Sequence, residues 1–283
     1  MLKGKKIVLG VTGGIAVYKA VDLVSKLRKQ GAEVRVVMTE HAQQFVTPLT
    51  FKEISGNKVA VSMWNANQEF NVEHIALADW ADLFMVVPAT ANIIAKMAYG
   101  IADDLLSTTL LAAHSPVIVC PAMNTHMYEN PATQENIAKI KSRGIVVMPP
   151  ASGVLACGAV GAGRLPEPAD IVNFVKNFFA KTEGNMRGLK VLVTAAGTRE
   201  PIDPVRYVGN RSSGKMGYSI AQAAAERGAE VTLVTGPSAL TPPPNIKVVN
   251  VETTQQMMDA CLAVYDGCDI VIKLSLIHIS EPT

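Results

Sequence analysis

Four places in the first half of the chain carry residue types suited to chemistry on a small molecule. Asn124 follows a proline that closes the apolar run Val117–Cys120, and such a run is typical of a buried strand. In open α/β sheets, ligands bind in the crevice beyond the carboxyl ends of the strands. Because asparagine is also a common turn former, the functional interpretation depends on three further places: Pro88–Asn92, His74 and Cys157.

Each of these three places also has a structural explanation. Thr90 and Asn92 offer a hydroxyl and an amide to a ligand, but either could simply cap a helix. A lone histidine such as His74 is more often structural than catalytic. Cys157 lies in a glycine-rich segment, 151–168, which we expect to be a flexible flap, so buried packing explains this cysteine poorly. The remaining histidines, for which we expect structural roles, are His41, His114, His126 and His278.

A glycine turn, Thr12–Ala16, separates a predicted strand at Lys6–Val11 from a predicted helix at Ile15–Gln30. Backbone N–H groups of such a turn, with the helix N-terminus, form an anion site. The dinucleotide fingerprint G-x-G-x-x-G and the P-loop lysine are both absent. Thr39, rather than an acid, follows the next predicted strand, Val34–Met38. The turn therefore favours a mononucleotide phosphate over a dinucleotide, and a turn without a ligand remains the alternative.

The pattern of strands alternating with helices predicts an α/β fold, a flavodoxin- or Rossmann-like parallel sheet with helices on both faces. Further strands are expected at Leu83–Val87, Val117–Cys120 and Ile145–Met148, and helices at Asn92–Tyr99, Asp103–Ala113, Pro131–Arg143 and Asp170–Phe179. Gly188–Thr194 repeats the shape of Gly4–Val11 and begins a second Rossmann-like domain. We therefore expect a first domain at 1–180, a linker at 181–187 and a second domain at 188–273.

Composition narrows the possible functions. The chain has 283 residues, 49% hydrophobic residues, 18% charged residues and a net charge of +2, without the basic run of a nucleic-acid-binding protein. It shows no signal peptide and no apolar stretch of membrane-spanning length, which predicts a cytoplasmic protein. The cysteines at 120, 157, 261 and 268 are spaced too widely for a zinc site, and we expect no metal site.

Taken together, these residues resemble the flavin-dependent cysteine decarboxylases. The resemblance is closer to the bacterial bifunctional family that joins phosphopantothenoylcysteine decarboxylase to phosphopantothenate–cysteine ligase. Pro88–Asn92 matches the family motif P-A-S-A-N with threonine as its third residue, and Pro121–Tyr128 matches P-x-M-N-x-x-M-W with a final tyrosine. The family's histidine and flap cysteine match His74 and Cys157. Two ordered motifs and two single residues make the resemblance specific over nearly the whole chain.

The resemblance implies FMN and the decarboxylation of 4'-phosphopantothenoylcysteine to 4'-phosphopantetheine in coenzyme A biosynthesis. Asn124 would bind the departing carboxylate without a charge, His74 would deprotonate or orient the thiol, and Cys157 would supply the final proton. The implied phosphate contacts are Gly13, Gly14 and Ile15, and the remaining implied FMN contacts are Thr39, Thr90, Ala91, Asn92, Ser107 and Ala122. The family also implies a homo-oligomer built from trimers, with FMN and substrate at subunit contacts.

The segment Thr198–Gly217 is similar to the nucleotide and dimer region of the family's ligase, which uses CTP and Mg²⁺. The resemblance implies that Asn210 holds the acyl-cytidylate and that Arg206 and Lys215 offset phosphate charge; a solvated basic turn is the alternative. Residues 274–283 depart from the family's pattern and resemble a non-native tail, so we expect an incomplete and inactive ligase half.

Three other functions would share part of this pattern of residues. A flavin decarboxylase acting on a peptide with C-terminal cysteine would share His74 and Asn124, although the ligase-like half argues against it. A non-catalytic, FMN-binding regulatory relative is disfavoured by the presence of both His74 and Cys157. An NAD-dependent reductase is disfavoured by the missing dinucleotide fingerprint.

Overall fold

The computed structural model describes residues 2–64, 73–154, 160–244 and 246–274. The chain forms two compact units, Met1–Asn173 and Phe174–Thr283. The boundary falls inside helix α9 (Pro168–Glu183), so the beginning of the segment predicted as a linker is helical. In the described part of the chain, no helix has the length and apolarity needed to cross a membrane.

The first unit is built on a parallel sheet with the order β3-β2-β1-β4-β5-β6, which confirms the predicted fold class. Its strands are β1 (Lys6–Val11), β2 (Glu33–Met38), β3 (Val59–Ala60), β4 (Leu83–Ala89), β5 (Val117–Pro121) and β6 (Val146–Val147). All residues of β4 are buried, as its continuously apolar sequence predicts for a central strand. The strand order reverses between β1 and β4, and this switch point is where open α/β sheets bind ligands.

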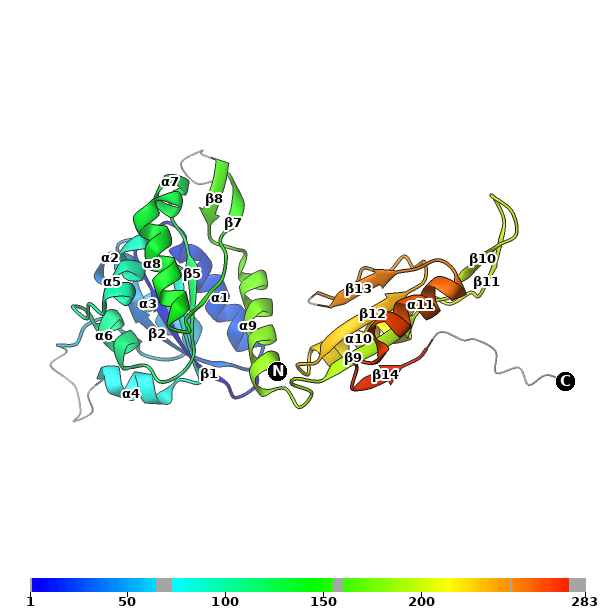
Figure 1. The fold of residues 1–283 in the computed structure, drawn as a ribbon. Coiled ribbons are helices and arrows are strands. Elements are labelled where there is room, and N and C mark those ends of the chain that lie inside the picture. The colour runs from blue at the N-terminus through cyan, green and yellow to red at the C-terminus, as the bar shows by residue number, and fades with distance from the viewer. Residues whose placement is uncertain (1, 65–72, 155–159, 245, 275–283) are drawn as a thin grey trace. The chain divides into compact units, whose positions relative to one another are not determined.

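Helices cover both faces of this sheet (Figure 1). They are α1 (Val17–Lys29), α2 (Glu40–Gln43), α3 (Pro48–Ser55), α4 (Glu73–Trp80), α5 (Ala91–Tyr99), α6 (Leu105–Ala112), α7 (Thr125–Glu129) and α8 (Pro131–Ser142). Helices α5, α6 and α8 share one core cluster with the side chains of Val8, Phe84 and Val119. Helix α1 packs against α3 and buries a stripe that includes Leu23 and Leu27, as its helical spacing predicts.

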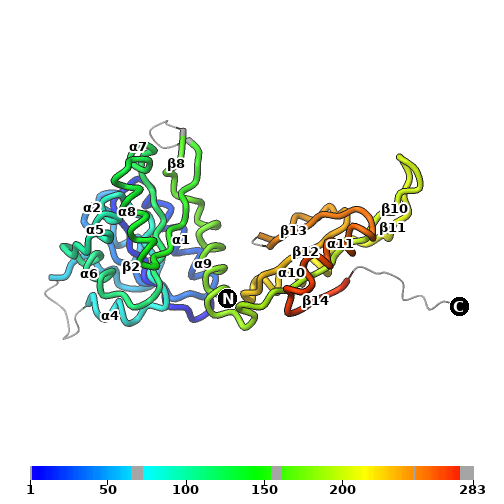
Figure 2. The backbone as a smooth tube through the Cα atoms, viewed as in Figure 1, coloured from blue at the N-terminus to red at the C-terminus, as the bar shows by residue number. Residues whose placement is uncertain are grey.

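An antiparallel hairpin occupies much of the segment for which the sequence predicted only a flexible flap. Strands β7 (Ala151–Val154) and β8 (Val160–Arg164) pair with each other, and their connection, 155–159, lies outside the described residues. The backbone trace places β8 beside α7 (Figure 2), in agreement with the contacts between these elements. Glycine-rich strands carry no apolar alternation, which is why periodicity did not reveal this hairpin.

The second unit contains a parallel sheet with the order β13-β12-β9-β14. Its strands are β9 (Lys190–Ala195), β12 (Glu230–Thr235), β13 (Lys247–Asn250) and β14 (Ile270–Ile272), and its helices are α10 (Lys215–Ala225) and α11 (Thr254–Tyr265). A small antiparallel ribbon, β10 (Arg199–Pro201) with β11 (Tyr207–Gly209), follows β9. The parallel sheet in the described part of this unit therefore has four strands.

Candidate active site

A buried hydroxyl joins the two strands that flank the switch point. Thr12 directly follows β1, and its Oγ1 donates a hydrogen bond to the carbonyl of Pro88 in β4 at 2.7 Å. The backbone N–H of Thr90 donates to the same Oγ1 at 3.1 Å. Thr12 is only 2% exposed, so its hydroxyl fixes the turn after β1 against the motif Pro88–Asn92. This role of Thr12 was not predicted, although a hydroxyl between a buried strand and a glycine pair was the available signal in the sequence.

The turn after Thr12 leaves the N-terminus of α1 open to an anion. Ala16 is the N-cap of α1 and provides no side-chain cap, and the first turn carries no acidic residue. The backbone at Gly13 lies so close to His41 that an added Cβ would be 2.5 Å from the His41 Cβ, whereas the space at Gly14 is open within 4 Å. Uncapped N–H groups beside an open glycine fit a phosphate group. Ile15, the third predicted phosphate contact, follows in this turn with its side chain exposed.

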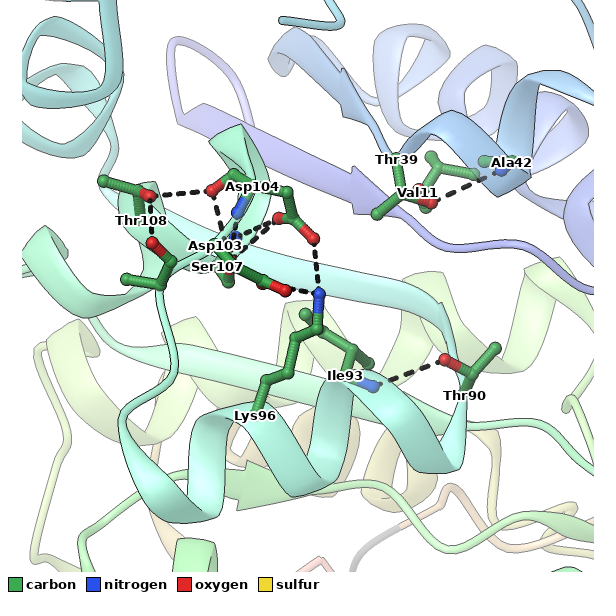
Figure 3. A network of polar contacts seen from close by, with 11 residues as sticks. Val11, Thr39, Ala42, Thr90, Ile93, Lys96, Asp103, Asp104, Ser107 and Thr108 are labelled. Atoms are coloured by element: carbon green, nitrogen blue, oxygen red, sulfur yellow. Dashed lines mark hydrogen bonds and ion pairs between the residues drawn. The ribbon is translucent and has the colours of Figure 1, made fainter. Parts of the chain in front are cut away.

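Two predicted hydroxyl contacts cap helices at the same edge of the sheet, as Figure 3 shows. Thr39 follows β2 and accepts a hydrogen bond from the Ala42 N–H at 3.3 Å, and Thr90 follows β4 and accepts from the Ile93 N–H at 3.4 Å. Thr90 therefore caps α5, which is the structural role that the sequence left open as an alternative to ligand binding. Capping uses the oxygen as an acceptor and leaves the hydroxyl of Thr90 able to donate. Ala91 begins α5, and Asn92 is exposed on its first turn.

Ser107, another predicted FMN contact, is 4% exposed and belongs to a polar network between α5 and α6 (Figure 3). Its hydroxyl accepts from the Asp104 N–H at 3.1 Å, while its own N–H donates to Asp104 Oδ1 at 2.8 Å, which forms a capping box at the start of α6. Lys96 contacts Asp103 at 2.6 Å and Asp104 at 2.8 Å. The network holds Ser107 in place and already engages its hydroxyl.

The charges of this network shift the pKa values of its members. Burial alone would raise the pKa of Asp104, but hydrogen bonds from Lys96 and Ser107 outweigh it and lower this pKa below its ordinary value. Burial would lower the pKa of Lys96, but its bonds to Asp103 and Asp104 raise it. Both members of the pair are therefore held in their charged forms around neutral pH.

Asn124 lies at the end of β5, as the sequence predicted, and is the N-cap of α7. Its Oδ1 accepts a hydrogen bond from the His126 N–H at 2.8 Å. Asn124 therefore also stabilises the turn, as asparagine commonly does. Just before it, the Ala122 N–H donates to the Ala89 carbonyl at 2.9 Å, which aligns the predicted FMN contact Ala122 with the end of β4. The structure thus brings Asn124, Ala122, Thr90 and the α1 turn to the carboxyl edge of neighbouring strands.

The hairpin packs directly on the Asn124 turn. The Met123 N–H donates to the Gly163 carbonyl at 3.0 Å, and a Cβ added at Gly163 would lie 2.4 Å from the Met123 oxygen. A Cβ at Gly161 would lie 2.6 Å from Thr125 Cγ2. Thr125 is 8% exposed, and its Oγ1 has no hydrogen-bond partner within the described part of the chain. The glycines of β8 are therefore required by close contact with Met123 and Thr125.

Helix α4, which carries His74, does not lie at this edge of the sheet (Figure 1). His74 is the second residue of α4, which packs against α6. Figure 1 shows α4 and α7 at opposite ends of the first unit. Cys157 lies outside the described residues, between the two strands of the hairpin. Of the three predicted catalytic residues, only Asn124 is thus placed at the switch-point edge by the described part of the chain.

Cys120 immediately precedes Pro121 but is not available for proton transfer. It is fully buried, and burial raises its pKa to about 12. Its Sγ lies 4.0 Å from the sulfur of Met148. The interpretation of Cys120 as a buried small hydrophobe agrees with this environment.

In the second unit, Asn210 and Lys215 lie near the carboxyl end of β9, but Arg206 does not. Asn210 contacts Gly197 just after this strand, and Lys215 begins α10. Arg206 lies in the turn of the β10–β11 ribbon and pairs with its neighbour Asp203 at 2.5 Å. A cavity of about 730 Å³ also opens in this unit, lined by Tyr218, Gly236, Pro237, Ser238, Leu240, Pro242, Asn250, Val251, Glu252 and Gln256.

Comparison with known families agrees with this geometry. Residues 1–180 match the flavoprotein family, and residues 186–277 match the DNA/pantothenate metabolism flavoprotein C-terminal domain. The fold and the switch-point site therefore define a flavoprotein. More specifically, the chain belongs to the family of the coenzyme A biosynthesis bifunctional proteins CoaBC.

Relatives in this family are similar along almost the whole chain. The CoaBC protein of Vibrio vulnificus (strain YJ016) is 50% identical over 281 residues, which are 99% of this chain and 70% of that protein. The CoaBC protein of Bacillus subtilis (strain 168) is 48% identical over 279 residues, covering 98% of this chain and 69% of its own length.

Solved structures resemble the first unit. A PPC decarboxylase mutant complexed with pantothenoylaminoethenethiol is 32% identical with a TM-score of 0.56, covering 62% of this chain and 99% of that one. The FMN-dependent cysteine decarboxylase SpaF is 30% identical with a TM-score of 0.54, covering 62% of this chain and 96% of its own.

Proposed function

We propose that this chain binds FMN and decarboxylates 4'-phosphopantothenoylcysteine to 4'-phosphopantetheine in coenzyme A biosynthesis. The observation that carries the proposal is the position of Asn124 at the end of β5, on the same edge as the uncapped turn of α1. Family membership and the similarity of the first unit to a PPC decarboxylase support it. We assign this activity to residues 1–180, with a linker at 181–187 and a second domain at 188–273.

The residues at the switch point fit FMN by their chemistry. The backbone N–H groups of Gly13, Gly14 and Ile15, beside the start of α1 that has no side-chain cap, would hold the phosphate. Small residues at Ala91 and Ala122 permit a flat ring to approach, and the hydroxyl of Thr90 is able to donate to it. Thr39, Asn92 and Ser107 complete the proposed set. When bound, FMN would supply the two-electron oxidation of the substrate and its later reversal.

Asn124 would bind the carboxylate that leaves as carbon dioxide. An amide forms hydrogen bonds to a carboxylate without neutralising its charge. A cation at this place would stabilise the substrate's anion more than the transition state, in which that charge is dispersing, and would slow the reaction. Cys157 would donate the proton that completes the product.

We further propose that His74 acts in a site shared between copies of the chain. Within one chain, α4, which carries His74, and α7, which begins at the Asn124 turn, lie at opposite ends of the first unit (Figure 1). A neighbouring copy could present it there. Large apolar side chains such as Ile75 and Leu111 are 43% and 65% exposed on this unit, which is consistent with a homo-oligomer, and we expect one built from trimers.

For the second unit we propose part of a ligase-type site, which would take CTP with Mg²⁺ in a complete ligase half. Asn210 and Lys215 lie near the end of β9, and Ser238, which lines the cavity, donates to the Ser213 carbonyl at 3.1 Å. The cavity thus adjoins the loop that leads into Lys215. The pairing of Arg206 with Asp203 supports a structural role for Arg206 rather than phosphate binding.

The visible spectrum of the purified protein and an assay with 4'-phosphopantothenoylcysteine test the main proposal together. We expect a flavin spectrum, or one that develops on adding FMN, and release of carbon dioxide from the substrate. A colourless protein that does not respond to FMN would refute the flavin assignment. The alternative is a flavin decarboxylase that acts on a peptide ending in cysteine, because it would share His74 and Asn124. Faster turnover of such a peptide than of 4'-phosphopantothenoylcysteine would establish that alternative instead.

A further inference from the structure

Helix α1 contains a lysine whose burial its own helix does not explain. The side chain of Lys19 is 7% exposed, and its Nζ lies 2.9 Å from Glu167 Oε1 and 3.1 Å from the Leu165 carbonyl. Burying an ammonium group is costly unless good partners compensate it. Lys26, on the same helix, instead has a side chain 40% exposed and pairs with Asp22 one turn away at 2.7 Å. Lys19 therefore differs by joining α1 to a segment distant in sequence.

The segment that Lys19 joins is the end of strand β8. Leu165 directly follows this strand, and Glu167 also pairs with Arg164, its last residue, at 2.7 Å. Upstream on β8, the Gly163 carbonyl accepts the N–H of Met123, the residue before Asn124. Because Gly163 contacts Met123 with no space for a Cβ, a shift of β8 would be transmitted to this turn.

A continuous set of contacts thus runs from α1 through β8 to the Asn124 turn. Helix α1 begins at the Gly13–Ile15 turn, and Lys19 lies in the first turns of that helix. We propose that Lys19 is a positioning residue that fixes the Asn124 turn relative to the phosphate turn at the start of α1. The catalytic part of this inference rests on the proposed function of Asn124, whereas the mechanical part does not.

The variant Lys19→Met tests this inference, because methionine keeps most of the length and removes the charge and the donors. Lys26→Met is the matched control on the same helix. Hydrogen–deuterium exchange of the full chain is measured for the peptide 121–128, which contains the Met123 amide, and for β1 as an internal reference. Steady-state kinetics with 4'-phosphopantothenoylcysteine and the FMN content are measured on the same preparations.

We expect Lys19→Met to accelerate exchange in 121–128 about tenfold or more, with β1 unchanged, because the Met123 bond opens locally. The turnover number should fall by about 10- to 100-fold, since small misplacements of a catalytic group have effects of this size. In a background carrying Asn124→Ala, the same change should have little further effect on turnover. Lys26→Met should leave every quantity unchanged.

Unchanged exchange in 121–128 would overturn the inference, as would an equal loss of turnover with and without Asn124, which indicates a general loss of stability. If Lys19→Met does not fold, Glu167→Gln replaces it and should show the same exchange pattern to a smaller extent. If the unmodified protein does not decarboxylate the substrate while Lys19→Met still accelerates exchange in 121–128, the proposed function fails and the positioning contact stands.

Discussion

The hydroxyl of Thr12 donates to the carbonyl of Pro88 at 2.7 Å and so joins the ends of β1 and β4 at the switch point. The same oxygen accepts the N–H of Thr90, which makes it the shared partner of two backbone groups. It lies between the turn proposed to hold phosphate and the motif proposed to contact the flavin ring. One buried hydroxyl therefore sets the spacing of two parts of the candidate site.

Thr12→Val should lower both stability and FMN affinity. Valine keeps the shape but leaves the Pro88 carbonyl and the Thr90 N–H without their partner, which costs about 1–3 kcal/mol when such groups are buried. Urea unfolding with flavin titration measures both effects. Thr12→Ser is the matched control because it retains the hydroxyl, and it should remain close to the unmodified protein. Equal behaviour of the two variants would show that the hydroxyl is not what matters.

Alanine substitutions at the two neighbouring glycines of the phosphate turn should have different effects on FMN binding. Gly13→Ala should weaken FMN binding about tenfold or more, because its Cβ would lie 2.5 Å from His41 Cβ and 2.8 Å from the His41 backbone, forcing the turn to move. Gly14→Ala meets nothing within 4 Å and should preserve the fold of the turn. The melting temperatures of both variants, measured without FMN, distinguish a change in the stability of the fold from a change in FMN affinity. If Gly13→Ala leaves the affinity for FMN unaltered, the phosphate binds elsewhere.

Apolar pattern was sufficient to predict the framework of the first unit. The continuous run in β4 and the helical stripe of α1 both mark burial directly, and their strand and helix ends then place Thr90, Ala122 and Asn124 at one edge of the sheet. These residues were predictable because strand direction in a parallel sheet sends every carboxyl end to the same side.

Features that depend on close contact were not predictable from pattern. The β7–β8 hairpin consists largely of small residues, and its place is set by the contact of Gly163 with Met123 rather than by an apolar face. The buried Lys19 resembles any other lysine in the sequence, and only its distance to Leu165 reveals its role. The resemblance that paired His74 with Asn124 does not specify whether one chain supplies both, and the fold separates their helices.

The ion pair between Lys96 and Asp104 should make the first unit sensitive to acid. Because the pKa of Asp104 is lower in the folded protein than its ordinary value near 3.8, its contribution is present above that value and is lost as pH falls through the folded pKa. The raised pKa of Lys96 leaves it charged across this range. Asp104→Asn keeps a good N-cap and removes the charge, and should cost at most about 1 kcal/mol at pH 7.

Urea midpoints measured at pH 7 and at about pH 3 test this expectation. The difference between the unmodified protein and Asp104→Asn should be present at pH 7 and should shrink at the lower pH. Asp104→Ala, which also removes the helix cap, should be less stable than Asp104→Asn at both pH values. A difference that grows on acidification would contradict the direction of the shift.

The two cysteines of the first unit should respond to substitution in opposite ways. Cys120 is fully buried with a pKa of about 12, so it holds its proton tightly and has no access to substrate. Cys120→Ala should lower stability by about 1 kcal/mol through the small cavity that it leaves, and should retain product formation.

Cys157→Ser should still release carbon dioxide but accumulate the unreduced enethiol, since the proposed proton donor is weakened. Chromatography of the enethiol and of the fully reduced product, together with measurement of the released carbon dioxide, distinguishes these outcomes. A Cys157→Ser protein that forms the fully reduced product at the unmodified rate would remove Cys157 from the reaction, and accumulation of the enethiol by a folded Cys120→Ala protein would place the proton donor in β5 instead.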